Sequence, residues 1–104
     1  MATGANCGEF HIHHSKVVDD DLRKLLWKAI ARGQGTAFAQ AFERIFSQLR
    51  KDPTSLGEIS YRLPNLRLQI RKVVIAPLVI EFAVSEDHQI VYIKGGKLLS
   101  KSKE

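Results

Sequence analysis

Residues 66–71 read LRLQIR, and this stretch decides the fold class because apolar and polar residues alternate along it without a break. Successive side chains of a β-strand point to opposite faces of the sheet. We therefore expect a half-buried strand with one apolar face and one basic face. The apolar face carries Leu66, Leu68 and Ile70, and the basic face carries Arg67, Gln69 and Arg71.

The stretch before this strand follows a helical period instead. In residues 22–30 and again in residues 38–49, apolar residues recur at the i, i+3, i+4 and i+7 spacing of one helix face. The first stripe consists of Leu22, Leu25, Leu26, Ala29 and Ile30, and the second of Phe38, Ala41, Phe42, Ile45, Phe46 and Leu49. Only a short glycine-containing turn separates them, which predicts an antiparallel helical hairpin.

The ends of the two helices are marked by capping residues. An aspartate of residues 19–21 is expected to cap the first helix, and Thr36 the second. Asp52-Pro53 is expected to end the second helix, because the residue before proline is pushed away from helical angles. Trp27 lies at the flank of the first stripe and is expected to be half-buried.

Further strands are expected on both sides of the hairpin. Residues 8–15 predict a short first strand, residues 54–60 a polar loop, and residues 78–84 and 89–94 two more strands. Short turns join the later strands, which favours antiparallel pairing. The predicted fold is α+β: a small antiparallel sheet packed on one face by a two-helix hairpin, in the order β-α-α-β-β-β. The face of the sheet that the helices do not cover would carry Arg67 and Arg71.

Length and composition predict one ordinary globular domain. The chain has 104 residues, of which 44% are hydrophobic and 26% charged, and this balance argues against disorder. We expect a single domain at residues 9–99, between a flexible N-terminus (residues 1–8) and a basic tail (residues 100–104). Apolar runs are far shorter than a membrane span needs. Cys7 is the single cysteine, so no intrachain disulfide is possible, which fits the cytoplasm.

Positive charge is concentrated in the second half of the chain. Residues 61–104 hold 8 basic and 4 acidic residues, whereas residues 1–60 hold 8 and 7. Such a balance points to a polyanionic partner. The cations that we expect to bind it are Arg62, Arg67, Arg71, Lys72, Lys94 and Lys97.

The remaining motifs do not indicate a metal site or a cofactor site. His11, His13 and His14 lack further ligands and supporting groups for a metal, so none is expected. The glycines match no phosphate-loop spacing, and no cofactor is expected. Tyr61 and Tyr92 are interpreted as structural, because tyrosines often pack their rings in small cores.

The order of elements resembles the RelE/ParE superfamily of bacterial toxin–antitoxin systems, which also serve plasmid stabilisation. The stretches that carry the resemblance are residues 51–58 (KDPTSLGE), 61–71 (YRLPNLRLQIR), 78–84 (LVIEFAV) and 90–94 (IVYIK). The resemblance spans about Glu9 to Leu99. It implies a concave sheet face lined by lysine and arginine, and a cognate antitoxin protein that wraps the toxin.

Members of this family that cleave messenger RNA inhibit translation inside the ribosome. Carried over to this chain, the resemblance implies Arg67, Arg71 and Lys97 as the catalytic residues of an endoribonuclease. Clustered cations would stabilise the charge that builds up on the phosphate during cleavage.

The chain departs from the family pattern at three places. Gln69 stands where a second cation often follows, Pro77-Leu78 replaces a Tyr-Arg pair, and no tyrosine follows Lys97. The catalytic set is therefore depleted. Two functions stay open: a toxin-like enzyme acting on mRNA in the ribosome, and a non-catalytic binding module or a poison of DNA gyrase on the same scaffold.

Overall fold

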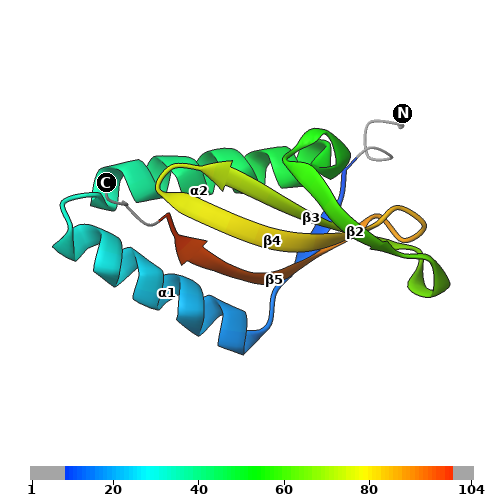
Figure 1. The fold of residues 1–104 in the computed structure, drawn as a ribbon, viewed down its shortest axis with the longest axis horizontal. Coiled ribbons are helices and arrows are strands. Elements are labelled where there is room, and N and C mark those ends of the chain that lie inside the picture. The colour runs from blue at the N-terminus through cyan, green and yellow to red at the C-terminus, as the bar shows by residue number, and fades with distance from the viewer. Residues whose placement is uncertain (1–8, 100–104) are drawn as a thin grey trace.

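Five strands form one mixed sheet in the order β1-β5-β4-β3-β2, in a computed structural model that describes residues 9–99. The elements are β1 (His11–His13), α1 (Lys16–Ala31), α2 (Gly35–Lys51), β2 (Glu58–Leu63), β3 (Leu68–Ile75), β4 (Leu78–Ser85) and β5 (Ile90–Leu98), with 3-10 helices at Pro53–Ser55 and Pro64–Leu66. The predicted α+β class, with two helices packed on a small sheet, is confirmed (Figure 1). The predictions for residues 1–8 and 100–104 concern residues outside this description.

The apolar stripes of both helices pack against one face of the sheet. Strand β4 lies at the centre, and its even-numbered side chains form the floor of the core. The buried core consists of Val18, Leu22 and Ala29 from α1, Phe38, Ala41, Ile45 and Leu49 from α2, and Val73, Leu78, Ile80, Phe82, Val84, Val91 and Ile93 from the sheet. We call this side of the sheet the helix face and the other side the open face.

The helix ends differ from the prediction at their first residues. Ser15 caps α1, because its Oγ accepts a hydrogen bond from the Val18 N–H at 3.2 Å. The aspartate cap is therefore wrong; Asp19 lies in the first turn, where it complements the positive end of the helix dipole. Gln34 occupies the N-cap of α2 without a side-chain hydrogen bond, so the Thr36 cap is also wrong. Helix α2 ends before Pro53 as predicted.

The outer part of α1 is more exposed than the apolar pattern predicts. Trp27 is 64% exposed and Ile30 48% exposed, although Trp27 was expected to be half-buried and Ile30 to belong to the buried stripe. The preceding residue, Ala29, is fully buried and belongs to the core instead. The first stripe is thus confirmed at Leu22 and Ala29, and wrong at Ile30.

The sheet has one more strand than the sequence pattern predicts. Residues 58–63 form β2 at the edge of the sheet, although residues 54–60 were expected to be loop. An edge strand exposed on both faces needs no apolar alternation, so no pattern marks it. Strand β5 continues through Gly95 and Gly96, where the prediction ended it. β1 pairs with β5 in parallel, which makes the sheet mixed.

The prediction for the two faces of residues 66–71 is wrong. Val73 belongs to the core under the helices, and the pairing of β3 with β4 runs without a shift from residue 69 to residue 75. Because side chains alternate along a strand, Arg71 lies on the helix face with Val73, and Ile70 lies on the open face. Val73, in the later half of β3, determines which face of the strand is buried. Residues 66–71 alone contain no residue that does so.

Candidate functional site

A row of side chains crosses all five strands on the open face. The pairing register places them side by side in the order Tyr61, Ile70, Ala83, Tyr92 and His13, from β2 to β1. Tyr61 is 45% exposed and Tyr92 37% exposed, so neither ring is packed in the core as expected, and their structural role stays a prediction. We call these five residues the aromatic row. It offers exposed ring surfaces at both ends of a short apolar floor.

Two contacts hold the rings of the aromatic row in place. The His13 ring packs edge-to-face on Tyr92, with 5.7 Å between the ring centroids. On the other side, Lys94 Nζ donates a hydrogen bond to the Tyr61 hydroxyl at 3.3 Å and lies 5.8 Å from the centre of its ring. Because Tyr61 and Lys94 come from β2 and β5, they meet above the strands between them, which accounts for the burial of Ile70 and Ala83.

A basic hollow adjoins the aromatic row. It has a volume of about 300 Å³ and is lined by Lys72, Val79, Glu81, Gly95, Gly96 and Lys97. Lys72 lies directly opposite Glu81 in the register of β3 and β4. The bulge in β5 inserts Lys94 next to Gly95, at the boundary between the hollow and the aromatic row. Two lysines and one carboxylate therefore line the hollow. Lys94 lies at its boundary, and Glu58 of β2 lies opposite Lys72 on the other side.

Gly95 and Gly96 shape the hollow in different ways. A Cβ on Gly95 would meet no heavy atom within 4 Å, so this position leaves the floor of the hollow open. A Cβ on Gly96 would lie 2.9 Å from Ile80 Cδ1 and 3.2 Å from Leu22 Cδ2, because α1 packs closely on β5 there. Gly95 thus leaves space on the open face, and Gly96 leaves space for the core side chains.

The side chain of Arg71 is buried and forms hydrogen bonds within the protein. It is 7% exposed, and its guanidinium donates to the backbone oxygens of Leu56 and Gly57 at 3.0 and 3.1 Å and to Gln69 Oε1 at 3.0 Å. Gly57 has a φ of +71°, and a Cβ there would lie 2.3 Å from the Lys72 carbonyl oxygen. Arg71 therefore fastens the segment between α2 and β2 to the edge of the sheet.

Arg67 and Arg62 also lie away from the hollow. Arg67 has a φ of 55° and ends the 3-10 helix before β3. Its Nη1 pairs with Asp87 Oδ2 at 3.0 Å, and its side chain is 77% exposed. Arg62 is exposed on β2 opposite Gln69, hence on the helix-face side of the sheet edge.

The structure brings together Lys72, Lys94 and Lys97 of the six predicted RNA-binding residues, and Lys97 alone of the three predicted catalytic residues. Arg67 and Arg71 do not lie beside Lys97. The alternation at residues 66–71 predicted that these two arginines share one open strand face, and this prediction is wrong. The roles assigned to the six residues stay predictions. Sequence reasoning missed Tyr61, Tyr92 and Glu81; the signal available was that Tyr92 alternates with Lys94 on one strand face.

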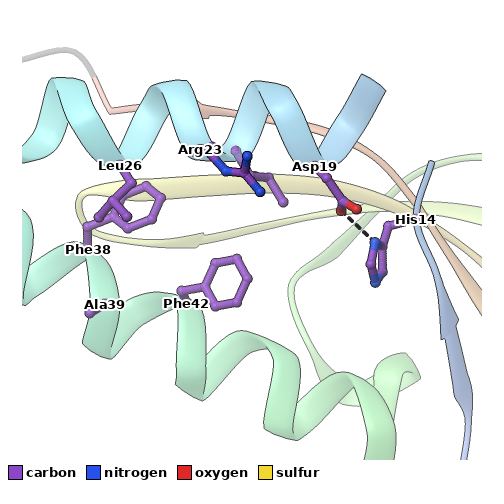
Figure 2. Close-up of a pocket in the computed structure, with 8 residues that line it drawn as sticks. His14, Asp19, Arg23, Leu26, Phe38, Ala39 and Phe42 are labelled. Atoms are coloured by element: carbon purple, nitrogen blue, oxygen red, sulfur yellow. Dashed lines mark ion pairs between the residues drawn. The ribbon is translucent and has the colours of Figure 1, made fainter. Parts of the chain in front are cut away.

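A second concave surface lies between the two helices. It has a volume of about 460 Å³, and its walls come mainly from Leu22, Leu26, Phe38 and Phe42. Figure 2 shows the ion pair of His14 and Asp19 at one end of this groove, with Leu26 and Phe38 farther along it. The groove is mostly apolar, whereas the open face combines exposed rings with cations. The open face is therefore the candidate functional site.

The histidines near the N-terminus have separate surroundings. His13 packs on Tyr92, and His14 pairs with Asp19. In residues 9–99, no group of three or more histidine, cysteine, aspartate or glutamate side chains is placed to hold a metal ion. No helix in the same range is long and apolar enough to cross a membrane.

Comparison with known proteins adds no relative. No protein-family model matches the chain, and no curated protein matches it in sequence.

Replacing Arg71 tests its structural role. Arg71→Ala removes a buried guanidinium and its hydrogen bonds to the backbone oxygens of Leu56 and Gly57, and should lower the free energy of unfolding by about 2 kcal/mol. The matched control is Arg67→Ala, which removes an exposed ion pair and should cost less than about 1 kcal/mol. Urea denaturation of both variants measures the difference. Equal, small losses would show that Arg71 does not fasten this segment.

Proposed function

We propose that this protein binds single-stranded RNA on the open face of its sheet. The observation that carries the proposal is the aromatic row beside the basic hollow. Proteins bind single strands by stacking unpaired bases on aromatic rings while basic side chains follow the phosphates. Tyr61, Tyr92 and His13 would contact the bases, and Lys72, Lys94 and Lys97 the phosphates.

The layout favours a single strand over a duplex. The faces of paired bases are stacked inside a double helix, so exposed tyrosine rings can reach them only when the bases are splayed out. Tyr61 and Tyr92 lie on strands of the sheet, Tyr61 on the edge strand β2 and Tyr92 on β5, and not on a protruding loop. A flexible strand can place its bases there and its phosphates beside the lysines.

This proposal includes the toxin-like role that the family resemblance implies. In that role, the bound strand is messenger RNA in the ribosome, the compartment is the cytoplasm, and a cognate antitoxin covers the open face when the protein is inactive. The α+β order of elements and the cationic sheet face support this role. The position of Arg71 favours the non-catalytic form, because its guanidinium is buried and bonded to Leu56, Gly57 and Gln69.

Removing a ring from the aromatic row should weaken binding. A stacked base contributes about 1–3 kcal/mol, so Tyr92→Ala should weaken the binding of a short oligouridine roughly fivefold or more. Trp27→Ala is the matched control, because Trp27 is an exposed ring on α1, away from the open face. Fluorescence anisotropy with labelled RNA measures both affinities. If the two variants bind equally well, the aromatic row is not the binding surface.

Removing a lysine from the hollow should change the salt dependence of binding. Each phosphate contact contributes about one unit to the slope of log K against log salt concentration. Lys97→Ala should therefore reduce the slope by about one unit. Lys28→Ala removes an exposed lysine from α1 and should leave the slope unchanged. The same slope in Lys97→Ala and the parent chain would place the phosphates elsewhere.

A further inference from the structure

Glu81 stands out on the open face because it is a carboxylate in a hollow otherwise lined by lysines and small or apolar residues. Its side chain comes from the central strand β4 and is only partly exposed. Within residues 9–99, Glu81 makes no ion pair within 4.0 Å and no side-chain hydrogen bond. Lys72, although directly opposite in the register, does not pair with it. A carboxylate beside a phosphate site weakens phosphate binding unless the ligand gives it a hydrogen bond.

The open face presents three successive levels along β4 and β5. The first is the aromatic row at Ala83 and Tyr92, the second contains Glu81 and Gly95, and the third contains Lys97 opposite Val79. On β4, neighbouring levels are two residues apart, or about 7 Å along the strand. On β5, the bulge at Lys94 adds one residue between the first two levels. A nucleotide has the same order of parts: base, ribose and phosphate. A base stacked on Tyr92 with its phosphate at Lys97 therefore places its ribose over Glu81.

The space over Glu81 can accommodate a sugar. Gly95 lies directly opposite Glu81 on β5, and a Cβ at Gly95 would touch nothing within 4 Å. The floor next to the carboxylate is therefore open at the level where the ribose would lie.

The chemistry of a carboxylate at this level selects one kind of sugar. An ionised glutamate only accepts hydrogen bonds, and a ribose 2′-hydroxyl is a donor that deoxyribose lacks. We propose, on the basis of the RNA-binding function above, that Glu81 is a specificity-determining residue that accepts a hydrogen bond from the ribose 2′-hydroxyl and so favours RNA over DNA. In a DNA complex, Glu81 would lie against a deoxyribose that has no 2′-hydroxyl, so no hydrogen bond would offset its repulsion of the neighbouring phosphates.

The test compares oligouridine with oligodeoxyuridine of equal length, so that the two ligands differ only in the sugar. The parent chain should bind the RNA roughly tenfold more tightly, since a hydrogen bond to a charged group is worth about that much. Glu81→Ala should bring the ratio close to one, by weakening RNA binding and strengthening DNA binding. Glu81→Gln keeps an acceptor oxygen and should give a ratio between the two.

A matched control separates this effect from general electrostatics. Glu86 is an exposed acid in the turn between β4 and β5, and Glu86→Ala removes the same charge as Glu81→Ala. It should affect RNA and DNA binding to the same extent and leave their ratio unchanged. Glu81→Gln preserves the size of the side chain, so the test does not depend on the folding of Glu81→Ala.

The outcomes distinguish this proposal from the function on which it rests. If the parent chain binds RNA and DNA equally, while Tyr92→Ala and Lys97→Ala weaken both, the open face binds single strands but Glu81 does not select the sugar. If Glu81→Ala keeps the preference of the parent chain for oligouridine over oligodeoxyuridine, another group selects the sugar and the proposal is overturned. If neither ligand binds the parent chain, the proposed function itself fails.

Discussion

The burial of one side of β4 under the two helices is the constraint on which the rest of the structure depends. Leu78, Ile80 and Phe82 are fully buried, and Val84 is 1% exposed. Because these side chains face the helices, their neighbours in the sequence must face the other way. The pairing register then determines which side chains of β3 and β5 face the helices. As a result, Arg71 lies on the helix face and Tyr92 on the open face. The candidate site is thus a consequence of core packing in the middle strand.

The helices and the fold class could be predicted from the sequence because each depends on a local period. Ile45 and Leu49 recur at helical spacing and are fully buried, and Asp52-Pro53 ends α2 where backbone sterics require it. The faces of β3 could not be predicted from residues 66–71. Either phase of that alternation is compatible with a strand, and the packing of Val73 decides between them.

The candidate site depends on features that no local pattern reveals. Tyr61 belongs to an edge strand with little burial, and its partner Lys94 is brought close by a bulge and by the pairing of strands distant in the sequence. The lysines could be recognised as a basic cluster from composition alone. Their grouping with Glu81 and two tyrosines depends on the register of the whole sheet. Arg71, one of the three predicted catalytic residues, instead binds the backbone of Leu56 and Gly57.

The central claim is that the open face, and not the groove between the helices, is the binding surface. The most direct test is a titration of isotope-labelled protein with short single-stranded oligouridine, followed residue by residue by NMR. The account predicts that the signals of Tyr61, Tyr92 and Lys97 shift while those of Leu26 and Phe42 in the groove stay in place. Shifts confined to the groove, or no shifts at all, would contradict it.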